Sequence, residues 1–135
     1  MFVIDASVAL AWCFEDETSS AADAVLGRLE SEAAVAPAHW PLEIANALRT
    51  AERRGRLDRA DLPRVRALLA ALPVAIAPLE LTTAIGGVLE AARTYDLSAY
   101  DATYLDLAAA RAIPLATIDA RLRDACTRAG VDLLG

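Results

Sequence analysis

The sequence predicts a single α/β domain over residues 1–135, in which helices cover both faces of a parallel β-sheet. Short apolar runs alternate with longer amphipathic segments along the chain, which is typical of parallel sheets built from β-α-β units. A length of 135 residues suits one hydrophobic core, and 56% hydrophobic residues with a mean hydropathy of +0.35 supply ample apolar surface to bury.

Five short apolar runs are expected to form the strands, because each is rich in apolar residues and too short for a stable helix. These runs are residues 2–5, 33–36, 74–77, 115–117 and 131–134. A parallel sheet that is covered on both faces needs such uninterrupted apolar strands.

Apolar residues at helical spacing predict seven helices between the strands. They span residues 6–14, 19–32, 39–54, 58–72, 82–95, 98–112 and 119–129, with a charged turn at 15–18. Ser98 is placed to cap its helix, and Gly55 and Gly130 stop two others. The regular part of the fourth helix should begin near Asp61, and Gly86–Gly87 weaken the fifth.

Cysteine usage and hydropathy point to a reducing, aqueous compartment. Cys13 and Cys126 lie in apolar helical patterns without Cys-x-x-Cys spacing, so we expect buried free thiols rather than a disulfide or redox pair. No apolar run approaches the roughly 18 residues of a membrane-spanning helix, and the chain starts with a strand-like segment instead of a basic leader. We therefore expect a cytoplasmic protein that does not enter membranes.

The formal net charge of −6 argues at first against a nucleic-acid partner, but the charge is unevenly distributed. All 13 basic residues are arginines, and seven of them fall within residues 49–66, which carry a net charge of +4 against −10 for the rest. Arginine forks suit phosphates. On charge alone, the simpler explanation of this stretch is an arginine-rich helical surface in contact with solvent.

Four carboxylates occupy positions that could bring them together. Asp5 and Asp119 follow the first and fourth strands, and the carboxyl ends of parallel strands are where open α/β sheets bind ligands. Glu43 and Asp101 lie near the starts of two helices. Each has an ordinary structural role available: Asp5 and Asp119 as helix caps, Glu43 as a surface residue, and Asp101 in a near-capping box with Ser98.

Taken together, the four acids indicate a cation site. Clustered carboxylates repel each other and raise each other's pKa values, and a hard divalent cation such as Mg²⁺ or Mn²⁺ removes that cost. Other hydrolytic arrangements have little support, because the only histidine, His39, stands alone as a helix-start residue and no glycine-rich phosphate loop is present.

Four segments then resemble the motifs of PIN domains, in that family's order and usual spacing and over essentially the whole chain. They are residues 3–8 (VIDASV), 41–48 (PLEIANAL), 100–105 (YDATYL) and 115–122 (LATIDARL). A compact chain of this kind is most similar to the VapC toxins of bacterial and archaeal toxin–antitoxin pairs. The resemblance implies a three-layer α/β/α sandwich whose five parallel strands have the order 3-2-1-4-5.

The same resemblance implies a function and a site. It implies a Mg²⁺- or Mn²⁺-dependent ribonuclease that leaves 5′-phosphate and 3′-hydroxyl ends, with structured RNA, often tRNA, as substrate. A cognate antitoxin and a homodimer are the implied partners. The implied metal ligands and catalytic residues are Asp5, Glu43, Asp101 and Asp119, and the implied polar supports are Ser7, Asn46 and Thr117.

Three further assignments rest on position. Asp106 points about 140° away from Asp101 on a helical wheel and is left outside the site, whereas Asp96 could be an outer contact. Arg53 and Arg54 follow Glu43 on the same helix and are the expected RNA contacts within the basic stretch.

Two rival classes can be compared with this interpretation. Receiver domains and haloacid-dehalogenase-like phosphatases share the layout, but both rely on a lysine and this chain has none. A non-catalytic PIN module that binds RNA or a protein partner is the other alternative, and the complete set of four acids counts against it.

Overall fold

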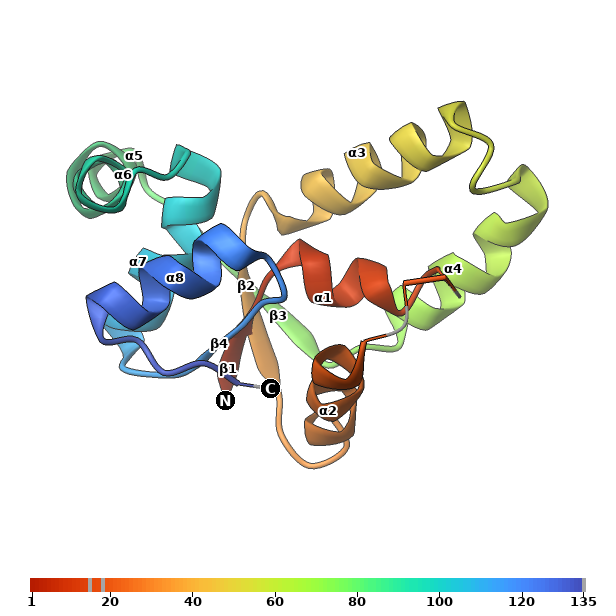
Figure 1. The fold of residues 1–135 in the computed structure, drawn as a ribbon, viewed down its shortest axis with the longest axis horizontal. Coiled ribbons are helices and arrows are strands. Elements are labelled where there is room, and N and C mark those ends of the chain that lie inside the picture. The colour runs from red at the N-terminus through yellow and green to blue at the C-terminus, as the bar shows by residue number, and fades with distance from the viewer. Residues whose placement is uncertain (15, 18, 135) are drawn as a thin grey trace.

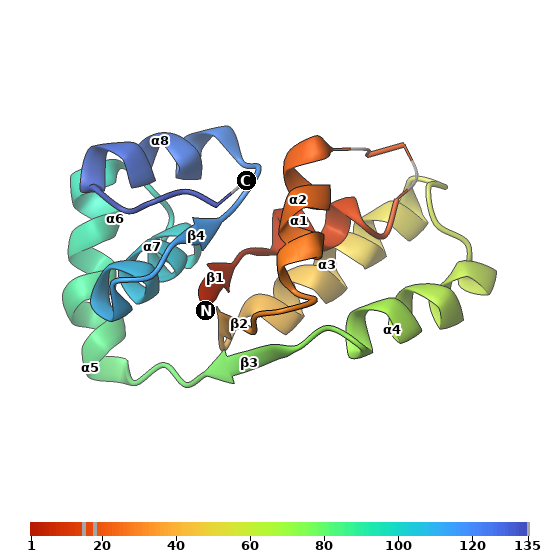
Figure 2. The same ribbon diagram turned by 90° about the horizontal axis from the view of Figure 1, so that it is seen from below.

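The computed structural model describes residues 1–14, 16–17 and 19–134, and it shows a parallel sheet with helices on both faces (Figures 1 and 2). The strands β1, β2, β3 and β4 lie in the order β3-β2-β1-β4, and every pairing is parallel. Their bounds are Phe2–Ile4, Ala34–Pro37, Val74–Ala77 and Leu115–Ala116. The predicted α/β/α architecture is therefore confirmed.

Eight α-helices surround this sheet in the part of the chain that the structure describes. They are α1 (Ala6–Ala11), α2 (Ser20–Arg28), α3 (Trp40–Arg53), α4 (Leu62–Ala70), α5 (Leu81–Thr83), α6 (Leu89–Tyr95), α7 (Ala99–Arg111) and α8 (Ala120–Ala129). Helices α1 to α4 lie on one side of the sheet and α5 to α8 on the other (Figure 2). Helix α7 packs directly on β1, β2 and β4, while α1 packs on α2 and α3.

The core lies around β1, the strand between β2 and β4. All three residues of β1 are fully buried, and Tyr104 and Leu105 of α7 and Leu122 of α8 pack into the same cluster. Because β1 is buried along its whole length, Asp5, which follows it directly, is held in a fixed position. Cys126 also belongs to this core, and Cys13 lies in a smaller cluster; both are buried free thiols, as predicted.

The prediction of five strands is corrected to four among the described residues. The expected fifth strand, residues 131–134, makes only an isolated parallel bridge between Leu133 and Leu115. Two backbone hydrogen bonds support it: Leu115 donates to the Asp132 carbonyl at 2.9 Å, and Leu134 donates to the Leu115 carbonyl at 3.0 Å. The segment does lie beside β4, where the fifth strand was expected, but β4 has only two residues and offers no longer ladder.

Two of the predicted helices differ in the structure, and the predicted start of the fourth is confirmed. The helix expected over 6–14 ends at Ala11, and the charged turn predicted at 15–18 includes Glu15 and Thr18, which lie outside the described residues. The helix expected over 82–95 is divided into α5, a π-helical turn (Ala84–Val88) and α6, because Gly86 adopts φ −102° and ψ −105°. The fourth helix begins after a 3₁₀ turn (Arg59–Asp61), at the place expected.

Gly87 in that π-helical turn allows a close approach between helices. A Cβ atom at Gly87 would lie 2.7 Å from the Asp106 Oδ1 atom of α7, which is too close for any real side chain. Asp106 thus faces the α5–α6 segment, and burial raises the pKa of its carboxyl. Its predicted place outside the acidic site agrees with this packing.

Among the residues that the structure describes, no helix combines the length and the apolar character that crossing a membrane requires.

Candidate active site

Four carboxylates from four different elements reach the carboxyl end of the sheet. Asp5 follows β1 and caps α1, while Asp119 follows β4 and caps α8. Glu43 lies in the first turn of α3, which follows β2, and Asp101 lies in the first turn of α7. The starts of α1 and α3 lie side by side above the sheet (Figure 1), as expected where neighbouring parallel strands end.

Asp5 is buried at 4% exposure and is fixed by three donors. Its Oδ1 atom accepts hydrogen bonds from the Ser7 hydroxyl at 2.7 Å and the Val8 backbone N–H at 3.2 Å, and its Oδ2 atom accepts one from the Thr117 hydroxyl. Asp5 can therefore cap α1 and also belong to a binding site. Its carboxylate accepts the capping hydrogen bond through Oδ1, and Oδ2 keeps a lone pair that a ligand could use.

Ser7 and Thr117 link the ends of β1 and β4. Ser7 Oγ accepts from the Ile118 backbone N–H at 3.1 Å, and Thr117 Oγ1 accepts from the Asp119 backbone N–H at 3.0 Å. The Asp119 Oδ2 atom in turn accepts from the Leu122 backbone N–H at 2.9 Å and caps α8. These bonds place Asp5 and Asp119 in one polar network, with Ser7 and Thr117 where supports were predicted.

Asp101 projects a carboxylate that is free of the capping interaction. The Ser98 hydroxyl accepts from the Asp101 backbone N–H at 3.1 Å, which is half of the predicted capping box. The Asp101 side chain makes no return bond to Ser98 in the described structure. It is half-buried beside the other acids and remains available to a ligand.

The electrostatics show that the four acids sense one another. The pKa of Asp5 is raised to about 6. Burial is the main cause and the charge of Asp119 adds to it, while the hydrogen bonds to Asp5 act in the opposite direction. Burial also raises the pKa of Asp101, and the charges of Asp119 and then Glu43 add to that rise. The repulsion and the burial outweigh the opposing effect of Arg121 on Asp101, which is typical of acids that a bound cation would neutralise.

The donor set fits a hard divalent cation. All the candidate ligands are carboxylate oxygens, which Mg²⁺ and Mn²⁺ prefer, and no thiolate lies among them. Among the described residues, no three acidic, histidine or cysteine side chains already form a compact cage. An ion that keeps several water ligands and binds one or two carboxylates directly, as Mg²⁺ usually does, fits this looser arrangement.

The Glu43 carboxylate has a close neighbour that the sequence analysis did not identify. His39 Nε2 lies 2.8 Å from Glu43 Oε1, one helical turn away, whereas exposed Asn46 makes no hydrogen bond with Glu43 within the described part of the chain. His39 was interpreted as a helix-start residue, and it does occupy the cap position of α3, but without a capping hydrogen bond. Its spacing of four from Glu43 was the available signal.

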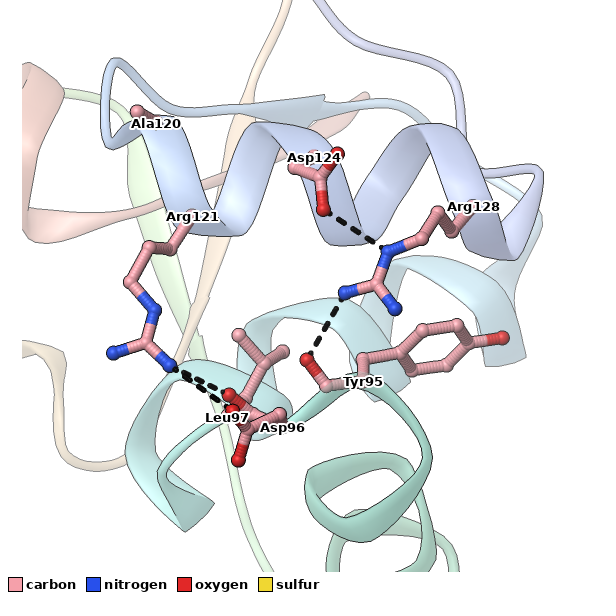
Figure 3. A pocket seen from close by; sticks show the side chains of 7 residues that line it. All are labelled: Tyr95, Asp96, Leu97, Ala120, Arg121, Asp124 and Arg128. Atoms are coloured by element: carbon pink, nitrogen blue, oxygen red, sulfur yellow. Dashed lines mark hydrogen bonds and ion pairs between the residues drawn. The ribbon is translucent and has the colours of Figure 1, made fainter.

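Arg121 is a second residue that the sequence did not single out. It lines a cavity of about 350 Å³ between α6 and α8 (Figure 3) and donates a hydrogen bond to the Asp96 backbone carbonyl at 2.8 Å. Its positive charge partly offsets the rise in the pKa of Asp101. Arg128 donates in the same way to the Tyr95 carbonyl at 3.1 Å. The predicted outer contact, Asp96, therefore pairs with Arg121 at the end of α6.

The two predicted RNA contacts lie away from the acids. Arg53 is the last residue of α3 and Arg54 is its exposed C-cap. Ten residues separate Glu43 from Arg53, which corresponds to roughly 15 Å along a helix axis. Helix α3 points away from the α7 and α8 side of the molecule (Figure 1), so the structure does not bring these arginines to the acidic cluster.

Comparisons with known proteins agree with this geometry. The family model for the PIN domain matches residues 2–127. The crystal structure of PAE2754 from Pyrobaculum aerophilum is similar to 92% of this chain and 78% of its own, with 26% sequence identity and a TM-score of 0.67. A toxin–antitoxin complex from Klebsiella pneumoniae contains a chain with the same fold, at 13% identity and a TM-score of 0.59, covering 88% of this chain and 87% of that one. No curated protein matches the sequence.

Proposed function

The chain belongs to the PIN-domain family, whose members are generally nucleases, and from this premise we propose that it is a Mg²⁺- or Mn²⁺-dependent endoribonuclease. One observation carries the proposal: Asp5 and Asp119 share one hydrogen-bond network at the strand ends, and the charges of Asp119 and Glu43 add to the rise that burial causes in the pKa of Asp101. A protein gains no stability from such repulsion, so the arrangement is best explained by a cation that relieves it.

In this proposal, some residues of the chain bind the cation and others orient those ligands. Asp5, Glu43, Asp101 and Asp119 would hold the cation, and Ser7 and Thr117 orient the Asp5 carboxylate through the hydrogen bonds described above. When bound, a divalent cation lowers the pKa of a coordinated water and stabilises the charge that develops on the scissile phosphate. The exposed side of Asp119 leaves the site open to a polymeric substrate.

The decisive experiment is RNA cleavage with Mg²⁺ or Mn²⁺, with and without a chelator. Glu43→Gln and Asp101→Asn should each abolish most of the cleavage while circular dichroism shows an unchanged fold, because each removes a charged ligand. Asp119→Asn should have a smaller effect, because its cap can be kept by the amide oxygen. If both folded ligand variants cleave like the parent protein, these acids are not the active site.

We further propose that the protein is the toxin of a toxin–antitoxin pair, acting in the cytoplasm on structured RNA such as tRNA. The motif set and the fold shared with the toxin–antitoxin complex from Klebsiella pneumoniae support a cognate antitoxin. Exposed Leu81, Ile85 and Leu89, which recur every four residues from α5 through the π-helical turn to α6, support a homodimer. Arg53 and Arg54 stay the proposed RNA contacts of the basic stretch, at a distance from the cut.

A non-catalytic PIN module that binds RNA or a protein partner is the competing function. It needs the fold and the basic surface but not the acids. The cleavage assay separates the two, because a binding module would retain RNA without cutting it in either metal.

A further inference from the structure

A buried polar cluster lies behind the Glu43 carboxylate. It contains His39, the only histidine of the chain, whose Nε2 atom is 2.8 Å from Glu43 Oε1. The His39 side chain is 15% exposed and that of Glu43 is 32% exposed, so this is a largely shielded contact. The close approach of the imidazole limits the space that the long glutamate side chain can occupy.

Two aromatic rings of α7 hold the imidazole in place. The Tyr104 ring meets it edge-on, with 5.0 Å between centroids and an angle of 65°, and the Tyr100 ring lies 5.5 Å away at 57°. Because Tyr100 and Tyr104 flank Asp101 on α7 while His39 and Glu43 belong to the start of α3, these contacts couple the two helices that carry the acids.

The Tyr104 hydroxyl is the unexplained member of this cluster. Tyr104 is 1% exposed, yet its hydroxyl has no well-directed hydrogen-bond partner among the described residues, and the same holds for the His39 Nε2 and Glu43 Oε1 atoms. A buried hydroxyl without a partner costs about 1–3 kcal/mol. Burial raises the pKa of Tyr104, and the negative charges of Glu43 and then Asp5 raise it further, so the group stays a proton donor beside carboxylates.

We propose that His39 and Tyr104 are positioning residues that hold the Glu43 carboxylate toward Asp5 and Asp101 when the cation binds. The imidazole restrains the carboxylate from the side of α3, and the hydroxyl is placed to donate to it from the side of α7. This proposal rests on the proposed function, because it takes Glu43 as a ligand. The alternative is that His39 only fills space at the helix start and the Tyr104 hydroxyl is incidental to the core.

The sharpest variant is Tyr104→Phe, which removes one oxygen atom and keeps the ring that packs on His39. Calorimetry measures the affinity of the full chain for Mn²⁺ in the absence of RNA. We expect this affinity to fall by roughly 10- to 100-fold, which is the usual effect of removing a group that supports a metal ligand. Cleavage at low Mn²⁺ should fall similarly and recover at high Mn²⁺, while KM for RNA is unchanged. The melting temperature should not fall, because the lost hydroxyl had no partner.

His39 is tested by a conservative pair of substitutions. His39→Leu keeps the apolar contact with the tyrosines and should weaken Mn²⁺ binding, whereas His39→Gln keeps an N–H donor near Glu43 and should restore most of it. Tyr95→Phe is the matched control. The Tyr95 ring contacts Arg128 of α8 and not the His39 cluster, so this substitution should leave Mn²⁺ binding unchanged.

Two results would overturn the proposal. Parental Mn²⁺ affinity in both folded variants, Tyr104→Phe and His39→Leu, would show that the cluster is only structural. The parent protein is measured first, and if it neither binds Mn²⁺ nor cleaves RNA, the proposed function itself fails. These two failures are distinguishable, because the first leaves metal-dependent cleavage by the parent intact.

Discussion

Replacing Asp5 with asparagine should make the metal-free protein gain stability relative to the parent as the pH rises. Burial raises the pKa of Asp5 from 3.8 to about 6, so the native state binds this proton more tightly than the unfolded state does. The contribution of Asp5 to the free energy of unfolding is therefore fully present at acid pH and is lost as the pH rises through about 6. Asparagine does not titrate and removes this loss.

The size of the effect follows from the two pKa values. A difference of about two units corresponds to about 3 kcal/mol in total, of which about 2 kcal/mol falls between pH 4.5 and 7.5. Asp5 is almost fully buried, so solvent screening reduces this figure little. Asp101 titrates in the same direction, but it is present in both proteins and cancels in the comparison.

Urea denaturation of both proteins at pH 4.5 and 7.5, in the presence of a chelator, measures the effect. The difference in unfolding free energy between Asp5→Asn and the parent should shift by about 2 kcal/mol in favour of the variant at the higher pH. The difference in unfolding free energy between variant and parent at pH 4.5 is subtracted from that at pH 7.5. This subtraction removes the pH-independent effect of the altered hydrogen bonds with Ser7 and Thr117. A difference that is independent of pH would refute the assignment of Asp5 as a buried carboxylate without a counter-charge.

Three further predictions concern the cation, the basic stretch and the packing of Gly87. At pH 7.5, Mn²⁺ at a hundred times its dissociation constant should stabilise the protein by about 2.7 kcal/mol and raise its melting temperature, reversibly with chelator; no shift at millimolar Mn²⁺ would contradict a cation site. Removing the charges of Arg53 and Arg54 should flatten the salt dependence of RNA binding by roughly one unit of log–log slope per lost phosphate contact, with Mn²⁺ affinity unchanged; an unaltered slope would assign the stretch to another surface. Gly87→Ala should gain less than the ~1 kcal/mol that alanine usually gains over glycine in a helix, because its Cβ displaces the Asp106 carboxylate, and the same change in an Asp106→Ala chain should recover the full gain; additive effects of the two substitutions would exclude the predicted contact.

Local signals were sufficient for much of the fold. The apolar run at residues 74–77 became β3 without any change of bounds, and Ser98 and Asp119 cap the helices that they were expected to cap. Caps and apolar periodicity are properties of a few neighbouring residues, so the sequence alone contains them. The grouping of Asp5 with Asp119 was also predictable, because parallel strands end at the same edge of a sheet.

Tertiary contacts decided the rest. Leu133 makes only a bridge because its neighbour β4 is two residues long, and the fifth helix is divided at Gly86. No local pattern fixes how far a strand pairs with a distant partner or where a glycine leaves helical geometry. These properties depend on which segments pack against one another.

The acidic site shows the same division. Its carboxylates could be identified from their positions after strands and at helix starts, because residue type and topology limit where such groups can lie. The surroundings of Glu43 could not: His39 was one helical turn away in the sequence, but Tyr104 lies near enough to feel the Glu43 charge only because α7 packs across β1 and β2. The sequence thus determined which carboxylates are the candidates for binding a cation. Only the tertiary structure decided their burial and their neighbours, because both depend on side chains that are far apart along the chain.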